Sequence, residues 1–128
     1  MNIYGIGTDI VNVNRIKKSL KNKSFIKRIF NQKEILKCKK LSRTLSCYAK
    51  RFAAKEAFSK ALGTGFRMNL NFKDIEVIND KMGKPYYVKN KKITKIIEKN
   101  FKIKNFKCFL SISDEKNYSI AFAIIQTS

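Results

Sequence analysis

The segment from about Ser42 to Leu62 is the strongest helix signal in this chain, and it constrains what the rest must do. Its apolar residues recur at spacings of three and four and form a wide stripe, which consists of Leu45, Ala49, Phe52, Ala53, Ala57, Ala61 and Leu62. Gly63, Thr64 and Gly65 follow directly, which is typical of a helix end. A helix with so broad an apolar side needs a second layer to cover it.

Strand patterns flank this helix on both sides in the sequence. Gly5 and Gly7 interrupt the first one, and glycines inside a strand indicate close approach of another backbone or of a ligand. The expected strands are Ile3–Asp9, Phe72–Ile78, Tyr86–Val88, Phe106–Ser113 and Tyr118–Ile125, the last two forming a hairpin. Shorter helices are expected after Val13, around Phe25 to Phe30, near Ile35 and from Ile93 to about Phe101. These elements predict an α+β fold, in which a long central helix packs on a mainly antiparallel sheet.

Length and composition predict one domain that spans residues 1–128, because 128 residues with 44% apolar content can form a single core. No run approaches the ~20 apolar residues of a membrane span, and the first residues lack a signal-peptide pattern, so we expect a cytoplasmic protein. Cys38, Cys47 and Cys108 are widely spaced and odd in number. We therefore expect reduced, partly buried thiols rather than a disulfide framework or a zinc site.

The chain contains no histidine, and its net charge is +20. The first fact excludes histidine bases, histidine metal ligands and serine–histidine triads, so catalysis would depend on carboxylates, lysine, arginine or a hard metal such as magnesium. The second predicts an acidic partner, which could be nucleic acid, an anionic membrane or a protein. A compositional drift toward lysine, asparagine and isoleucine would explain the charge equally well.

Asp9, Glu56 and Lys60 form the candidate catalytic set. Asp9 closes the first strand, and the other two lie four residues apart in the long helix. Two carboxylates can hold a divalent cation, and an ammonium group can contact phosphate oxygens. Spacing alone also permits ordinary roles, since Glu56 and Lys60 could stabilise an exposed helix as an ion pair and Asp9 could cap the next helix.

Two further segments have the same double interpretation. The stretch from Arg15 to Arg28 is densely basic with no acid, so it is either a solvated face or a docking surface for an acidic partner. Gly83-Lys84-Pro85 is either turn chemistry between two strands or part of a phosphate site.

Three segments together resemble the bacterial holo-acyl-carrier-protein synthases over essentially the whole chain. They are Gly5-Ile6-Gly7-Thr8-Asp9-Ile10-Val11, the run Arg51-Phe52-Ala53-Ala54-Lys55-Glu56-Ala57 continuing to Gly65, and Gly83-Lys84-Pro85. The resemblance implies transfer of 4′-phosphopantetheine from coenzyme A to a serine of an apo acyl carrier protein, with magnesium and with release of adenosine 3′,5′-bisphosphate, in support of fatty acid biosynthesis. It also implies a homotrimer with active sites between subunits.

The resemblance assigns roles to individual residues. Asp9 and Glu56 match the metal-binding acids, and Lys60 matches the lysine that faces the pyrophosphate; either Glu56 or a metal-bound water would take the serine proton. The expected nucleotide contacts are Arg51, Phe52, Gly63, Gly83, Lys84 and Pro85. The expected carrier-docking residues are Arg15, Lys21, Phe25 and Arg28.

One departure from the family pattern and two rival interpretations remain at the level of sequence. Where many members have histidines, this chain has Phe109 and Asp114, to which we assign no phosphate contact. The high charge and the aromatic content also suit a small nucleic-acid-binding protein, although no nucleic-acid motif is present. A family member that lost activity is the other rival, and the intact Asp9, Glu56 and Lys60 argue against it.

Overall fold

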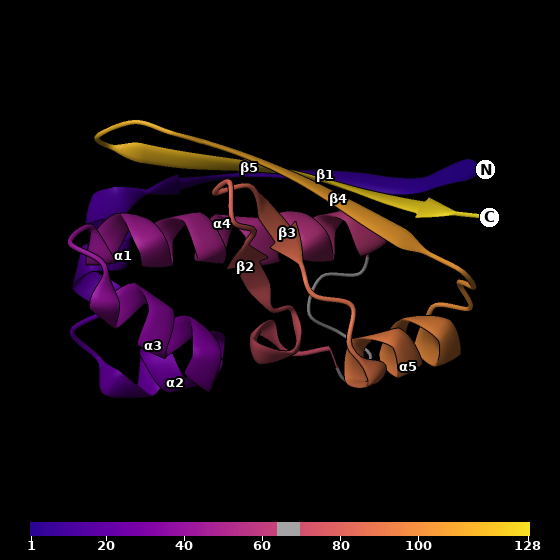
Figure 1. Cartoon of the computed structure of the whole chain (residues 1–128), viewed down its shortest axis with the longest axis horizontal. Coiled ribbons are helices and arrows are strands. Elements are labelled where there is room, and N and C mark those ends of the chain that lie inside the picture. Colours follow the sequence, from indigo (N-terminus) through magenta and orange to yellow (C-terminus); the bar gives the residue numbers. More distant parts are fainter. Residues whose placement is uncertain (64–69) are drawn as a thin grey trace.

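A computed structural model of the chain describes residues 1–63 and 70–128, so Thr64 and Gly65 of the expected helix end lie outside it. Strand β5 (Tyr118–Thr127) lies between β1 (Asn2–Asn12) and β4 (Lys107–Asp114) in an antiparallel sheet of order β1-β5-β4. Helix α4 (Thr44–Leu62) runs along one side of this sheet (Figure 1). The predicted α+β architecture, with a long central helix on an antiparallel sheet, is confirmed.

The glycines of β1 allow the strand to lie directly on the backbone of α4. A Cβ atom built on Gly7 would lie 2.0 Å from the Ala57 carbonyl oxygen, and one on Gly5 would lie 1.9 Å from that of Ala61. Strand β5 faces the same helix with small side chains, because Ala121 and Ala123 are completely buried. The sequence expectation of a close backbone approach at these glycines is confirmed.

The shorter helices surround the other sides of α4. Helices α1 (Val13–Ser19), α2 (Lys23–Ile29) and α3 (Gln32–Lys40) gather near its N-terminal end, and α5 (Lys91–Asn100) lies toward the opposite end (Figure 1). Each begins at an asparagine whose side-chain oxygen accepts a backbone N–H of the first turn; these residues are Asn12, Asn22, Asn31 and Asn90. Asn12 rather than Asp9 is therefore the cap of α1.

The expected strand Phe72–Ile78 was wrong in its first half. Phe72–Asp74 forms a short 3-10 helix, η1, and only Val77–Asn79 forms strand β2, which pairs with β3 (Pro85–Tyr87). The Asp74 carboxylate accepts the Asn71 N–H at 3.0 Å, and the Lys55 ammonium donates to the carbonyl oxygens of Phe72 and Ile75. These side chains satisfy backbone groups that a strand would have used in pairing.

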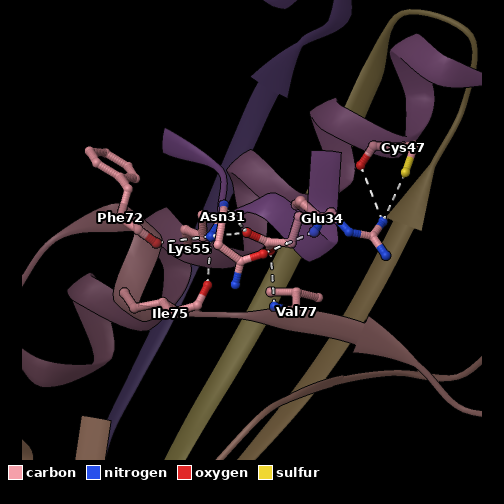
Figure 2. Close-up of polar contacts among 8 residues, drawn as sticks. Asn31, Glu34, Cys47, Lys55, Phe72, Ile75 and Val77 are labelled. Carbon is pink, nitrogen blue, oxygen red and sulfur yellow. Dashed lines mark hydrogen bonds and ion pairs between the residues drawn. The ribbon is translucent and has the colours of Figure 1, made fainter. Parts of the chain in front are cut away.

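Lys55 belongs to a fully buried ion pair that ties three parts of the fold together (Figure 2). Its Nζ lies 2.8 Å from Oε1 of Glu34 on α3, and both side chains are completely buried. The other Glu34 oxygen accepts the N–H of Val77 at 3.0 Å. Helix α3, helix α4 and the segment leading into β2 are thus joined through one carboxylate and one ammonium group.

The expectation for the cysteines was also wrong. Cys38 near the end of α3 and Cys47 in the first turns of α4 form a disulfide bond, with their Cα atoms 5.4 Å apart; Cys108 is a free thiol. The two cysteines are nine positions apart in the sequence, and the turn between the helices brings them to bonding distance.

The face of the sheet that points away from α4 is apolar and exposed. Side chains alternate along β5, so that Ile120 and Phe122 are exposed while their neighbours are buried. On β1, Ile6 and Ile10 are 58% and 62% exposed. Within the described ranges no helix has the length and apolar character needed to cross a membrane.

Candidate active site

The second half of β1 and the second half of α4 bring the three predicted catalytic residues together. Lys60 Nζ lies 3.0 Å from Oδ1 of Asp9 and 3.1 Å from the Thr8 carbonyl oxygen. Lys60 therefore forms its ion pair across two elements, with Asp9, and not as the exposed helix pair that was the alternative. The Asp9 side chain is largely buried at this junction, whereas that of Lys60 is half exposed.

Glu56 lies one turn before Lys60 on α4, and its environment disfavours its negative charge. Partial burial raises the pKa of Glu56, the nearby carboxylate of Asp9 raises it further, and Lys60 opposes both effects. Two carboxylates close enough to repel each other, with an ammonium group beside them, favour a cation between the acids. Among residues 1–63 and 70–128 no three acids, cysteines or histidines gather into a group that could hold a metal ion.

A second cluster, which we call the basic pocket, lies at the N-terminal half of α4. It has a volume of about 450 Å³ and is lined by Lys37, Leu41, Ser42, Arg43, Ser46, Cys47, Lys50, Arg51, Asn79, Asp80, Lys81 and Gly83. Two of the predicted nucleotide residues, Arg51 and Gly83, are in this set. The excess of cations over its one acid makes the pocket suitable for an anionic group.

Arg51 is the most buried cation of the basic pocket. Its Nη2 donates to Oδ1 of Asn79 at 2.8 Å, and Asn79 in turn donates to the Gly83 carbonyl oxygen at 3.0 Å. Arg51 is only 4% exposed, and its Nε has no hydrogen-bond partner among the described residues. Burial lowers the pKa of Arg51, and Glu34 counteracts this effect. A buried donor without a partner is energetically costly.

The other predicted nucleotide residues lie apart from the lining of this pocket. Lys84 and Pro85 follow Gly83 at the start of β3, and Gly63 ends α4 in a left-handed conformation. Phe52 stacks between Phe25 and Phe72, with ring centroids 6.0 and 5.7 Å away. The structure thus places Phe52 in an aromatic stack that reaches the predicted docking residue Phe25.

The predicted docking cations are exposed on neighbouring elements. Arg15 lies on α1, Lys21 lies between α1 and α2, and Arg28 is in the last turn of α2. Phe25 on α2 is partly buried. These residues therefore lie on the small helices beside α4 and can meet a partner from solvent.

The two residues that depart from the family pattern have different surroundings. Phe109 is 51% exposed on β4. Asp114 accepts a hydrogen bond from Ser46 at 3.2 Å and lies 3.7 Å from Lys50 Nζ. Asp114 therefore joins the hairpin of β4 and β5 to the rim of the basic pocket.

Sequence reasoning missed most of the basic pocket. Arg43, Ser46, Lys50 and Arg51 follow helical spacing on one side of α4, which was the available signal. Lys37 and Asn79 come from other elements and gave no signal of their own.

Comparison with known proteins identifies the family. The family model described as the 4′-phosphopantetheinyl transferase superfamily matches residues 5–123. The holo-[acyl-carrier-protein] synthase of Pelagibacter ubique is 65% identical over 126 residues, which cover 98% of each chain. The chain belongs to the holo-[acyl-carrier-protein] synthase family of phosphopantetheinyl transferases. The family consists of enzymes, so these matches favour catalysis over the nucleic-acid-binding alternative.

Solved structures of this family have the same fold. The holo-[acyl-carrier-protein] synthase from Neisseria meningitidis superimposes with a TM-score of 0.88 at 38% identity, covering 98% of this chain and 100% of the other. The enzyme from Bacillus anthracis, whose structure is a complex with CoA (3′,5′-ADP), has a TM-score of 0.81 at 39% identity and covers 98% of both chains. The Helicobacter pylori enzyme, solved in complex with coenzyme A, has a TM-score of 0.78 at 32% identity, with 94% and 99% coverage.

Proposed function

We propose that this chain, as one domain, transfers 4′-phosphopantetheine from coenzyme A to a serine of an apo acyl carrier protein. The serine oxygen attacks the phosphorus that bears pantetheine, the bond from this phosphorus to the bridging oxygen breaks, and adenosine 3′,5′-bisphosphate leaves. The serine proton passes to a base. The observation that carries this proposal is the convergence of Asp9, Glu56 and Lys60 at one junction of β1 and α4.

The acid pair fits a magnesium ion. Asp9 and Glu56 supply hard oxygen ligands. Burial raises the pKa of Glu56, the Asp9 carboxylate raises it further, and a dication held by both acids would relieve this repulsion. When bound, magnesium would withdraw charge from the pyrophosphate and make its phosphorus easier to attack. Asp9 and Glu56 would be its two protein ligands, and this small number suits magnesium, which usually keeps several bound waters.

Lys60 supplies a fixed positive charge beside this pair. Its contacts with Asp9 and the Thr8 carbonyl oxygen hold the ammonium group beside the second half of β1 without burying it. An ammonium group in this position can contact a pyrophosphate oxygen and stabilise the charge that develops on the leaving group.

The basic pocket is proposed to bind the nucleotide end of coenzyme A. Arg51 presents a buried guanidinium that Asn79 orients, and Lys37, Arg43 and Lys50 surround it. Guanidinium groups match phosphate oxygens in geometry and charge. The Bacillus anthracis relative, which binds CoA (3′,5′-ADP), supports this assignment. Gly63, Gly83, Lys84, Pro85 and Phe52 remain assigned to the same ligand by family resemblance.

The exposed apolar face of the sheet supports a homotrimer. It carries Ile3, Ile6, Ile10, Phe109, Tyr118, Ile120 and Phe122, each at least 40% exposed. A contiguous apolar surface of this kind marks a protein interface. A trimer would cover it and would place active sites between subunits.

We further propose that Arg15, Lys21, Phe25 and Arg28 dock the acidic carrier protein, with the surrounding lysines steering its approach. The reaction would take place in the cytoplasm and would support fatty acid biosynthesis.

Site variants test the proposed chemistry. Asp9→Ala and Glu56→Ala should each lower kcat/KM by more than about 100-fold without loss of helical circular dichroism, because each removes a ligand of the metal. Lys60→Ala should slow the transfer step, but it should change the affinity for magnesium less than Asp9→Ala or Glu56→Ala does. Glu98→Ala, an exposed acid on α5, is the matched control and should retain normal activity. Near-normal turnover of Glu56→Ala at saturating magnesium would exclude the proposed role.

A further inference from the structure

The disulfide bond lies against the arginine that we assign to the nucleotide. Cys47 precedes Arg51 by one turn of α4, and Arg51 Nη1 lies 3.2 Å from the Cys47 sulfur and 3.4 Å from the Cys47 carbonyl oxygen. The other terminal nitrogen of Arg51 donates to Asn79. The guanidinium is therefore fixed between the disulfide on one side and the end of β2 on the other.

The disulfide also fixes the wall of the basic pocket. It links α3 to α4 across the turn that contains Leu41, Ser42 and Arg43, and all three of these residues line the pocket. Because a disulfide restricts the separation of the two Cα atoms it joins, it restricts this turn as well.

We propose that the Cys38–Cys47 disulfide positions Arg51 for nucleotide binding, so that its reduction weakens the binding of coenzyme A. The inference rests on the proposed function of the basic pocket. Cys38 is completely buried and Cys47 nearly so. Two separate thiols need more room than one disulfide, so in a close-packed interior their formation displaces Cys47 and the guanidinium in contact with it.

The redox step is a thiol–disulfide exchange with a dithiol. Cys47 lines the basic pocket. A thiolate of the dithiol attacks the Cys47 sulfur and forms a mixed disulfide, the Cys38–Cys47 bond breaks, and Cys38 leaves as a thiolate that is then protonated. The second thiol of the reagent then releases Cys47 as a thiol, and the reagent becomes a disulfide. The cations of the basic pocket, Lys37, Arg43, Lys50 and Lys81, attract the anionic attacking group.

Steady-state kinetics under two redox conditions test the inference. The wild type is compared after incubation with a dithiol and after incubation with an oxidised disulfide reagent. Reduction should raise the KM for coenzyme A about three- to tenfold, the change expected when one charge-assisted contact is weakened, and should leave kcat and the KM for the carrier protein nearly unchanged. A merely structural disulfide would change kcat and both KM values together, or none of them.

Two variants separate this disulfide from the remaining cysteine. Cys108→Ser retains the disulfide and should respond to redox state as the wild type does. The double variant Cys38→Ser/Cys47→Ser should have the higher KM under both conditions. A wild type with equal KM values in both conditions, or a double variant that still responds, would overturn the inference.

Alkylation followed by mass spectrometry gives a readout that needs no turnover. Denatured oxidised protein should take up one alkyl group, at Cys108, and reduced protein should take up three. Three groups under both conditions would overturn the inference. Adenosine 3′,5′-bisphosphate should slow the reduction, because it covers Cys47. If no transfer occurs under any condition, the proposed function fails, and the alkylation experiment alone decides the inference. Slower reduction of the disulfide in the presence of the bisphosphate supports the inference, and an unchanged rate of reduction refutes it.

Discussion

The buried pair of Glu34 and Lys55 should be the most sensitive charged contact for stability. Lys55 Nζ has three acceptors, namely Glu34 Oε1 at 2.8 Å and the carbonyl oxygens of Phe72 and Ile75 at 2.9 and 2.7 Å. Substitution Lys55→Met keeps most of the side-chain volume but removes all three hydrogen bonds. Glu34 would then remain as a buried carboxylate without its cation.

The expected loss of unfolding free energy is about 3–5 kcal/mol, since removal of one partner strands the other charge in the interior. That is a large share of the roughly 5–15 kcal/mol by which domains are stable. The melting temperature should fall by roughly 10–20 °C. The double variant Glu34→Gln/Lys55→Met should lose less than the sum of the single losses, because the two residues share one interaction.

Urea unfolding followed by circular dichroism provides the measurement, with a lower midpoint and an unchanged slope as the expected result. Lys50→Met is the matched control on the same helix. Lys50 is 38% exposed and lies 3.7 Å from Asp114, so its loss should cost less than about 1 kcal/mol. If Lys55→Met were no more destabilising than Lys50→Met, the pair would not hold α3, α4 and β2 together.

Four further outcomes are expected. Gly7→Ala should destabilise by more than about 3 kcal/mol in urea unfolding, because the new Cβ would lie 2.0 Å from a backbone oxygen of α4; a neutral effect would contradict this close packing. In metal-free protein at neutral pH, Glu56→Gln should raise the free energy of unfolding by less than about 1 kcal/mol. Burial and the neighbouring carboxylate raise the pKa of Glu56 in the folded state, so the wild type loses stability as pH rises through that pKa and the carboxyl group ionises. The difference should vanish well below the ordinary pKa of 4.5, and a variant less stable at neutral pH would refute the repulsion. Ile10→Glu should convert a trimer to monomers in sedimentation, and a wild type that is a fully active monomer at micromolar concentration would exclude the shared-site arrangement. Arg15→Glu should raise the KM for the carrier protein, and the second-order rate constant of the wild type should fall steeply with salt as the Debye length shrinks from ~10 Å at 0.1 M to ~3 Å at 1 M. An equal effect of Lys95→Glu on this KM would mean that only the overall charge matters.

Much of the fold was predictable because it depends on local patterns. The apolar stripe of α4, its end at Gly63 and the hairpin of β4 and β5 depend on residues close in sequence, and the structure confirms them. Gly7 also gave a valid signal, since a strand position without a side chain predicted that another backbone lies against it. The error at Phe72–Ile78 arose because Lys55, distant in sequence, occupies the carbonyl groups that would have paired.

The candidate site was predictable only in part, and for the same reason. The residue types of Asp9 and Glu56 made them candidate ligands, spacing alone favoured ordinary roles for both, and the resemblance in motif was needed to assign them to a metal. The basic pocket depends on how α3, α4 and the turn after β2 pack, so residues such as Lys37 and Asn79 gave no local signal. The disulfide was missed because the angle between two helices cannot be read from the sequence between Cys38 and Cys47, which are nine positions apart.

Mass spectrometry of an apo acyl carrier protein incubated with this chain, coenzyme A and magnesium tests the central proposal most directly. The carrier protein should gain the mass of one 4′-phosphopantetheine group, and adenosine 3′,5′-bisphosphate should appear in equal amount. Omission of magnesium, or the Glu56→Ala variant, should abolish the gain. An unmodified carrier protein after incubation with folded wild type, together with tight and salt-sensitive binding of the chain to DNA, would contradict the proposed transfer.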